Sequence, residues 1–536
     1  MWASLLLLAA LFSIGTGAIA LWFLRDHGPT LAVRRWSESS SWLALVFGLG
    51  FGLQIFANPA PEVVGWLYFD ELQGLLVPYI LLMGVLVKRF AYHSLQSNPK
   101  YARFFLKIKL LIATLLLFVV LNHAIPLFIS WMASGWVMVG LIAHTGTEAA
   151  QNSARLARQR FLIGDGLMLA GLSTLVVLSG SFYLTDWFPR LTSLHFTAGG
   201  NAGAAIALTL ALLAIALGAF SKTAQVPFQQ WLPHTLVGPT PVSAIMHAGF
   251  VNSGAILLAK LAPLVVQQPA VMTLLFAGGL ASVLWGSTAM LVQTDVKRYL
   301  TFSTIGQMGF MMMECGLGAF HLAILHLMVH GFFKGRMFLS AGRVMEHRPA
   351  IRNIQAQQYA QSRTAMPLFA SLKLGSAVFL AMLATGWLVW QMPILQQSLL
   401  ELPSILLVTL ALSILFTQTI LIKIKGARMK GFGVAFLFSL LLIGLYVAYE
   451  RLAQHILPDL NLLHHSSGLG LFKWSSAIVL VLGGLTWLWH LRLLPVPLSL
   501  QRQWYVYWLN AAGTFPKNST FSGRALSSSS PVNIQP

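Results

Sequence analysis

The 536-residue sequence is poor in charge and almost without cysteine. Only 9% of its residues are Asp, Glu, Lys or Arg, whereas soluble domains carry about 25%. Soluble cores would need a larger polar shell, so the low charge excludes an ordinary water-soluble protein. The single cysteine, Cys315, excludes a disulfide framework and a cysteine-based metal site.

Acidic residues are scarcer than basic ones. The chain has 14 Asp and Glu against 34 Lys and Arg, which gives a formal net charge of +20. In a soluble protein this excess would suggest nucleic-acid binding. Here the basic residues lie in short clusters between apolar runs, as the rule for orienting membrane loops requires. We therefore expect a lipid bilayer around the chain and no nucleic-acid partner.

Hydrophobic residues make up 57% of the chain and recur in runs long enough to cross about 30 Å of hydrocarbon. The sequence predicts an all-α polytopic membrane protein with about 15 transmembrane helices. The first run lacks a basic start and a cleavage site, so we interpret it as a span rather than a signal peptide. The predicted spans are 2–24, 41–57, 70–87, 104–121, 123–145, 161–182, 202–225, 241–261, 270–292, 299–315, 317–345, 366–390, 403–421, 431–449 and 473–491.

Loop charge predicts the orientation of these spans. Lys and Arg follow the first, third, fifth, ninth, eleventh and thirteenth spans, and are missing after the second, fourth, tenth and twelfth. This places the N-terminus in the periplasm and the C-terminus in the cytoplasm of a bacterial inner membrane. The tail 501–536 is Ser-rich and expected to be largely disordered. No soluble domain fits in any loop, so chemistry outside the bilayer belongs to a partner.

Ionisable residues inside apolar runs are rare and usually functional. Lys222 ends an apolar stretch, and prolines that must break the helix follow it at positions 227, 233, 239 and 241. A lysine at such a break can exchange a proton. It can equally extend its ammonium group to the cytoplasmic interface, and residue types alone leave both interpretations open.

Histidines supply the other candidates. His247 lies early in an apolar span, where it either relays protons or hydrogen-bonds a neighbouring helix. His326, His330 and Lys334 are spaced four residues apart, so they share one face of a helix over about 12 Å. A zinc site is the alternative, but no carboxylate or thiol has matching spacing, so we favour a proton relay.

Two acidic positions complete the set. Asp165 stands between Gly164 and Gly166, which we interpret as a turn inside a span, and a buried carboxylate there needs a cationic partner. Asp295, Lys297 and Arg298 form a cluster at the cytoplasmic start of the span 299–315. That cluster is either loop charge that orients the span or a partner interface and point of proton access.

Two blocks resemble a known family. The first runs Ser221-Lys222-Thr-Ala-Gln-Val-Pro-Phe, then Trp231-Leu-Pro, then Gly238-Pro-Thr-Pro-Val-Ser-Ala. The second is Asp295-Val-Lys-Arg-Tyr-Leu-Thr-Phe-Ser-Thr-Ile-Gly-Gln-Met-Gly with the His326–Lys334 run. Both are similar to antiporter-like subunits of respiratory NADH-quinone oxidoreductase (L, M and N) and of multisubunit sodium/proton antiporters. The resemblance covers roughly residues 60–420.

The resemblance implies a domain organisation. Two inverted five-helix repeats, 104–261 and 270–421, would each contain a broken helix. N-terminal helices (1–103), C-terminal helices (422–500) and the tail would flank them.

The resemblance also implies roles for the candidate residues. Lys222 would be the central proton-carrying lysine, and His247 the relay on the next helix. His326, His330 and Lys334 would form the polar axis between half-channels, and Asp165 would match a carboxylate of the family.

The sequence departs from the family pattern twice. Met132 follows Trp131 where the family carries a glutamate that pairs with the central lysine, so Lys222 is expected to lack its usual counter-charge. The second broken helix has no ionisable group in residues 386–393, where the family carries a lysine or glutamate.

These departures and the compact C-terminus make the chain similar to the membrane subunit of DAB-type inorganic-carbon accumulation systems. That resemblance implies a subunit that is not itself an enzyme. It would conduct protons or Na⁺ and couple the gradient to CO2 hydration by a large cytoplasmic DabA-like zinc protein. No cofactor is expected in this chain, with zinc on the partner. The alternatives are a subunit of a respiratory complex or of a cation/proton antiporter, and a membrane anchor that has lost conduction.

Overall fold

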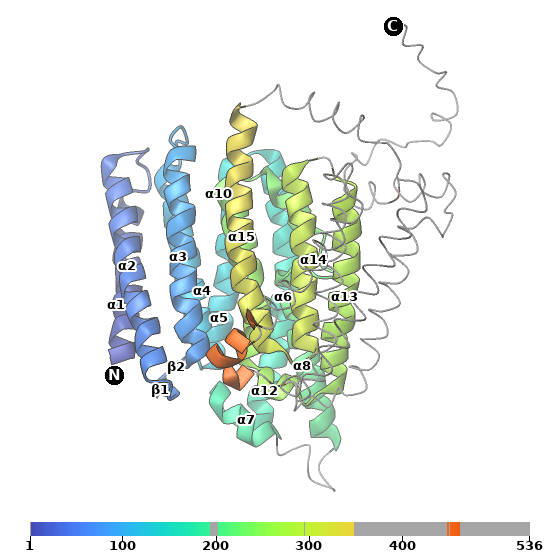
Figure 1. Ribbon diagram of the computed structural model, residues 1–536. Coiled ribbons are helices and arrows are strands. Elements are labelled where there is room, and N and C mark those ends of the chain that lie inside the picture. Colours follow the sequence, from blue (N-terminus) through green and yellow to red (C-terminus); the bar gives the residue numbers. More distant parts are fainter. Residues whose placement is uncertain are drawn as a thin grey trace, which may run out of the picture.

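The computed structural model describes residues 2–192, 202–293, 295–347, 448–449, 451–460, 462 and 507. Long helices lie side by side in a bundle (Figure 1). The first half comprises α1 (Trp2–Phe23), α2 (Leu31–Ala57), α3 (Glu71–Ser94), α4 (Tyr101–Val120), α5 (Ala124–Ile142) and α6 (Glu148–Ser179). Then follow α7 (Leu184–Thr192), α8 (Ala202–Lys222), α9 (Trp231–His234), α10 (Thr240–Ala248), α11 (Ser253–Lys260), α12 (Ala262–Val265), α13 (Pro269–Leu291), α14 (Val296–Gly316) and α15 (Phe320–His347).

Short elements connect these helices. Two strands, β1 (Glu62–Val64) and β2 (Leu67–Phe69), pair as an antiparallel hairpin between α2 and α3. Single 3-10 turns occupy Ala143–Thr145, Thr235–Val237, Phe250–Asn252 and Pro458–Leu460. Neither the hairpin nor α7 was predicted, because both are short and lack the long apolar run on which the prediction relied.

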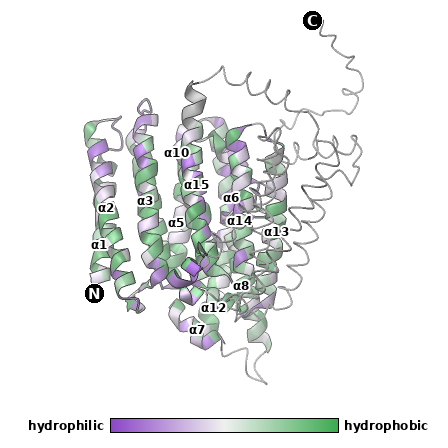
Figure 2. Ribbon diagram, in the orientation of Figure 1, coloured by the Kyte–Doolittle hydropathy of each residue, from purple (hydrophilic) through white to green (hydrophobic). Residues whose placement is uncertain are grey.

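The chain is a multi-pass membrane protein. Among the described residues, nine helical stretches are long and apolar enough to cross a membrane. Large apolar side chains point outward from them, such as Phe12 of α1 and Val177 of α6, which are 73% and 79% exposed. Figure 2 shows hydrophobic residues along much of the outer helices. Such an apolar exterior suits lipid rather than water.

Every predicted span from 2–24 to 317–345 coincides with a helical segment, and the later predicted spans lie outside the described residues or almost entirely so. Two helices begin far earlier than predicted: α2 at Leu31 instead of 41 and α6 at Glu148 instead of 161. In each case a threonine caps the first turn, Thr30 accepting from Val33 N and Thr147 from Ala150 N. Hydropathy alone missed these polar first turns.

The turn predicted around Asp165 is wrong. Helix α6 continues unbroken through Gly164, Asp165 and Gly166. Gly164 faces α8, where a Cβ at Gly164 would lie 2.5 Å from Ser221 Cβ, and a Cβ at Gly218 would lie 2.9 Å from Gly164 O. The glycine therefore serves close helix packing and not a turn.

The span formed by α10 and α11 lies in the middle of the bundle and is almost wholly buried. It packs against α3, α8, α14 and α15, while α1, α2, α3 and α4 pack on one another as an N-terminal unit. This arrangement puts the residues that follow the break after Lys222 in the interior.

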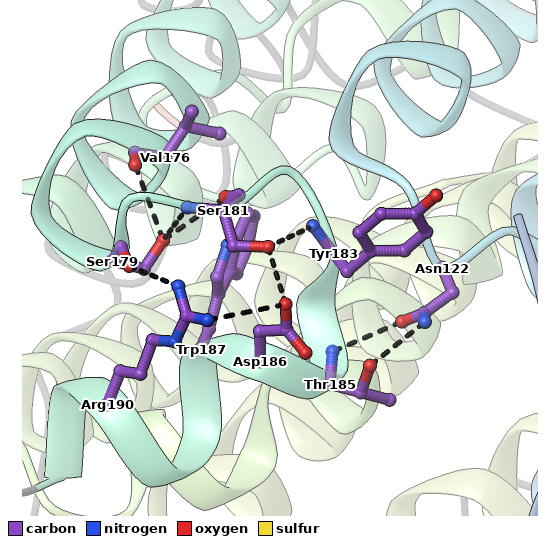
Figure 3. Close-up of polar contacts among 9 residues, drawn as sticks. All are labelled: Asn122, Val176, Ser179, Ser181, Tyr183, Thr185, Asp186, Trp187 and Arg190. Atoms are coloured by element: carbon purple, nitrogen blue, oxygen red, sulfur yellow. Dashed lines mark hydrogen bonds and ion pairs between the residues drawn. The ribbon is translucent and has the colours of Figure 1, made fainter.

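One end of the bundle, here called the hairpin end, carries β1, β2 and α7 (Figure 1). There the α4–α5 connection is tied to α7, because Asn122 Nδ2 donates to Thr185 Oγ1 (3.0 Å) and Asn122 Oδ1 accepts from Thr185 N (3.2 Å). Ser181 Oγ donates to Asp186 Oδ2 at 2.6 Å, and Arg190 donates to a carbonyl at the end of α6 (Figure 3). The connections that follow α1, α3 and α5 lie at the opposite end.

Candidate proton pathway

Lys222 is the last residue of α8 and is completely buried. Its ammonium group donates to the carbonyl of Trp131 and lies 3.4 Å from Ser134 Oγ, both on α5. The same group lies 3.9 Å from the centre of the Trp131 ring, a cation–π contact. Lys222 therefore points into the protein, and the interpretation that it extends to the membrane surface is wrong.

Asp165 of α6 supplies a counter-charge. Its Oδ1 lies 3.7 Å from Lys222 Nζ, and both side chains are buried. The expectation that Met132 leaves Lys222 without a counter-charge is corrected by this ion pair, because the carboxylate comes from α6 instead of α5. Asp165 Oδ1 makes no hydrogen bond of normal length within the described residues, but the carboxylate interacts with the indole N–H of Trp131 as well as with Lys222.

His247 lies on α10 and is completely buried. Its ring stacks on Phe338 of α15, with centroids 4.3 Å apart, and its Nε2 lies 3.5 Å from Thr301 Oγ1 of α14. Nδ1 has no hydrogen-bond partner among the described residues. Lys334 and His330 are close enough to interact with His247 electrostatically.

The predicted stripe of His326, His330 and Lys334 lies along α15, which is a continuous helix. The rings of His326 and His330 are 6.3 Å apart, and Lys334 Nζ donates to the carbonyl of Leu300 on α14 at 3.2 Å. His330 and Lys334 are buried. The three titratable groups therefore lie on one side of α15, as their spacing predicted, and this side faces the protein.

The structure adds two residues that the sequence analysis missed. Glu314 Oε2 of α14 lies 3.1 Å from His326 Nδ1, and Gln307 Oε1 lies 2.9 Å from His326 Nε2, both within hydrogen-bond distance. Glu314 stands in the apolar run 308–315, so the rule that singled out Lys222 would have found it. A carboxylate therefore stands beside the HxxxH pair, although no group of three metal-ligating side chains forms in the described part of the chain.

Two groups of titratable residues result. One joins Lys222 and Asp165 across α5, α6 and α8, and the other joins His247, His326, His330 and Lys334 with Glu314. Phe250, whose ring centre lies 5.8 Å from Lys222 Nζ, stands beside the first group. Within the described residues no contact joins the two groups directly, so a proton moving between them would need water or a side-chain movement.

The third predicted set lies at the opposite end of the bundle. Asp295 caps α14 by accepting from Arg298 N at 2.8 Å, and Lys297 Nζ donates to Thr240 Oγ1 at 3.2 Å. Asp295, Lys297 and Arg298 also line a cavity of about 630 Å³, shared with the start of α6 and with the segment 233–237 after the helix break. The predicted empty break at 386–393 lies outside the described residues.

This fold and these buried groups define a class of membrane transport subunit. A family model described as "NADH:quinone oxidoreductase/Mrp antiporter, TM" matches residues 121–424, more than half of the chain. The chain belongs to this family of antiporter-like membrane subunits.

Among its relatives, a probable inorganic carbon transporter subunit DabB1 of Halothiobacillus neapolitanus is 41% identical over 286 residues, 52% of this chain and 50% of that protein. NADH-quinone oxidoreductase subunit L of Pseudomonas aeruginosa is 32% identical over 340 residues, 58% of this chain and 54% of that protein. The chain thus spans about half the length of these curated relatives.

Two solved structures share the fold. The Mrp complex from Dietzia sp. contains a chain with a TM-score of 0.57 and 19% identity, covering 98% of this chain and 61% of that one. The membrane-bound sulfane sulfur reductase, an archaeal respiratory membrane complex, contains one with a TM-score of 0.58 and 15% identity, covering 95% and 97%. At these identities the likeness concerns the fold alone.

Proposed function

We propose that the chain is the proton-conducting membrane subunit of an inorganic-carbon uptake complex. It would couple the gradient of H⁺, or of Na⁺, to CO2 hydration by a cytoplasmic zinc partner. The buried Lys222–Asp165 ion pair at a helix break carries the conduction proposal, because charges at that depth are costly without a function. The 41% identity to an inorganic carbon transporter subunit supports the choice of substrate.

In this proposal Lys222 accepts and releases the proton, and Asp165 stabilises its charged form. A movement that lengthens the 3.7 Å pair weakens this stabilisation and favours proton release. The His326–Lys334 face of α15 receives the proton, with His247 beside it and Glu314 balancing charge on His326. Each group in this route is either buried or enclosed between helices, which limits leakage to water.

The hairpin end faces the periplasm in this proposal, and the cavity lined by Asp295, Lys297 and Arg298 faces the cytoplasm of a bacterial inner membrane. That face would admit protons and receive a DabA-like zinc protein. Zinc on the partner would activate the water that attacks CO2. The present chain contributes no covalent step.

A respiratory or antiporter subunit is the second candidate. It is favoured by the 32% identity to subunit L and by the fold shared with the Mrp complex. A non-conducting anchor is the third, which Met132 and the lack of an ionisable group in residues 386–393 suggested. The presence of Asp165 beside Lys222 weakens that candidate, because an anchor has no need of a buried ion pair.

Extraction of the complex from its native membrane in mild detergent separates the first two candidates. One large soluble zinc-containing protein in the purified complex supports inorganic-carbon uptake. If several membrane subunits with iron–sulfur or antiporter partners co-purify instead, the chain is a respiratory or antiporter subunit, and the proposal of inorganic-carbon uptake is wrong.

The variant Lys222→Met tests conduction. We expect it to abolish growth at ambient CO2 when the complex is the only source of bicarbonate in a carbonic-anhydrase-deficient bacterium, while the partner still co-purifies. Lys107→Met is the matched control, since Lys107 of α4 donates to the carbonyl of Gly140 and lies outside the pathway. Full growth of bacteria that carry Lys222→Met would contradict conduction through Lys222 and would leave the non-conducting anchor as the remaining candidate function.

A further inference from the structure

The titratable side of α15 leads from the middle of the bundle toward the hairpin end. Helix α15 begins at that end, at Phe320, where it packs on the turn Pro458–Leu460, and it runs to the opposite end (Figure 1). Lys334 lies fourteen residues, or about 21 Å, from this beginning, and His326 lies six residues, or about 9 Å, from it. His330 lies between them. His326 is therefore the member of the stripe nearest to the hairpin end.

Glu314 extends this row of groups to α14. Its two carboxylate oxygens lie 3.1 and 3.3 Å from His326 Nδ1. Helix α14 begins beside Asp295 at the opposite end and finishes at Gly316, two residues after Glu314. The backbone of Glu314 thus lies about 3 Å along the helix axis from the last residue of α14. The row of titratable groups that starts at Lys334 therefore ends close to the hairpin end.

The hydrogen bonds of His326 determine where its protons lie. Its Nε2 lies 2.9 Å from the amide oxygen of Gln307, which can only accept, so this nitrogen carries a hydrogen. A neutral ring then has no hydrogen on Nδ1. The contact between Nδ1 and Glu314 consequently holds one proton, which is on the carboxyl group when the ring is neutral and on the ring when the carboxylate is charged. Because either distribution keeps the hydrogen bond, the proton can pass between the two groups without a rearrangement of their side chains.

The step from His326 to His330 is longer. Their ring centres are 6.3 Å apart, and His330 Nε2 has no hydrogen-bond partner among the described residues. A water molecule between the two rings would complete the connection, since a bridging water serves nearly as well as a direct hydrogen bond. His330 would then exchange protons with Glu314 through His326.

Exposure increases along the same row. Lys334 and His330 are 2% and 5% exposed, whereas Glu314 is 9% exposed and the side chain of His326 is 19% exposed. The Glu314–His326 pair is therefore the least enclosed part of the row, as a site of exchange with bulk water requires. Residues 386–393 offer no substitute for it, because none of them is ionisable.

We propose that Glu314 is the proton-exchanging group through which the α15 stripe communicates with the hairpin end of the bundle. In one direction the O–H bond of the Glu314 carboxyl breaks as an N–H bond forms at His326 Nδ1, and the carboxylate then takes a proton from water at the hairpin end. The reverse step returns the proton. The inference rests on the proposed function and deepens it, because it names the residue at which the route ends on the periplasmic side.

The variant Glu314→Gln tests this role, because an amide keeps the shape and the hydrogen bond to His326 but has no proton to exchange. We expect proton flux in proteoliposomes of the whole complex to fall by at least about 100-fold, while the partner still co-purifies. Glu314→Asp, which keeps the carboxyl group, should retain part of the flux. If Glu314→Gln fails to assemble, Glu314→Asp against Glu314→Asn gives the same comparison at equal side-chain length.

The double variant Glu314→Gln with Gln307→Glu separates proton exchange from simple charge balance. It moves the carboxylate to the other nitrogen of His326, seven residues or about 10 Å deeper along α14. A carboxylate that only balances charge on His326 would serve there equally well, so restored flux would overturn the proposal. We expect the flux to stay low.

His321→Gln is the matched control. His321 is also a buried residue of the first turn of α15, but it lies beside Leu460 and outside the stripe, so this variant should conduct as the wild type does. Flux that survives in Glu314→Gln but not in Lys222→Met would overturn this inference and leave the proposed function intact. Flux that survives in both variants would contradict the proposed function itself.

Discussion

A lysine at membrane depth is stable only where something nearby offsets its charge, and Lys222 has Asp165 for this purpose. The carboxylate comes from α6, whereas Met132 occupies the α5 position where related chains are expected to carry glutamate. Trp131, next to Met132, still contributes its carbonyl and its ring face to the same ammonium group. The charge balance is therefore kept while its source has moved from one helix to another.

This relocation can be tested by moving the carboxylate back. We expect Asp165→Asn to leave Lys222 buried without a counter-charge, at a cost of about 3–5 kcal/mol, and to abolish proton flux. Adding Met132→Glu to that variant should restore part of the flux in proteoliposomes. Flux that persists in Asp165→Asn alone would remove Asp165 from the pathway.

Asp70 gives a second prediction at this scale. It caps α3 by accepting from Leu72 N and Gln73 N, and burial raises the pKa of its carboxyl to about 6 in spite of these bonds. The folded state therefore binds this proton more tightly than the unfolded state does. Its contribution to stability is full below pH 4 and falls, by at most about 3 kcal/mol, as pH rises to 6.

The Asp70→Asn variant keeps a side-chain oxygen for the cap and has no proton to lose. We expect the Tm of the wild type, relative to this variant, to fall between pH 4 and 6 and then to level off. A constant difference from pH 4 to pH 7 would show that Asp70 titrates normally.

At the scale of elements, glycines decide how closely the pathway helices approach. Gly164 and Gly218 face each other across α6 and α8, and this close contact brings Asp165 within reach of Lys222. The sequence showed the glycines but not their purpose, because a Gly-Asp-Gly run is equally typical of a turn. Only the neighbouring helix distinguishes the two.

Gly164→Ala should separate α6 from α8, because its Cβ would collide with Ser221 and with the Gly218 carbonyl. We expect a loss of about 1–3 kcal/mol and a lower Tm. Gly166→Ala is the matched control: a Cβ there meets nothing within 4 Å, and alanine favours the helix. Equal Tm values for the two variants would contradict the packing argument.

Hydropathy located the helices well and their ends poorly. The predicted spans within the described residues all coincide with helices, since an apolar run of that length has few other solutions in a bilayer. It missed the polar starts of α2 and α6, and it missed the β1–β2 hairpin, whose pairing depends on only three residues a strand. Spacing identified the α15 stripe, and the rule for ionisable residues in apolar runs would have found Glu314 as well. That Glu314 and Gln307 of α14 contact His326 required knowledge of which helix lies opposite.

Across the whole molecule, buried charge is distributed unevenly. Four lysines are buried in the described part of the chain, at positions 88, 109, 222 and 334, and the buried carboxylates are Asp165 and Glu314. Both carboxylates lie in the candidate pathway, so compensation there is internal to the protein. In the N-terminal unit Lys88 and Lys109 contact the hydroxyl groups of Ser40 and Ser41 instead, and no carboxylate of the described residues forms an ion pair with either lysine.

Tyr79 of α3 connects these two regions. Its hydroxyl donates to the carbonyl of Ala248, beside His247, at 2.7 Å and fills the space that a side chain at position 331 of α15 would need. Gly331 is therefore matched to a residue that lies outside the region 121–424. It follows that this region is not an interchangeable module: a chimera that exchanges it between relatives must also match positions 79 and 331, or its halves will not fit.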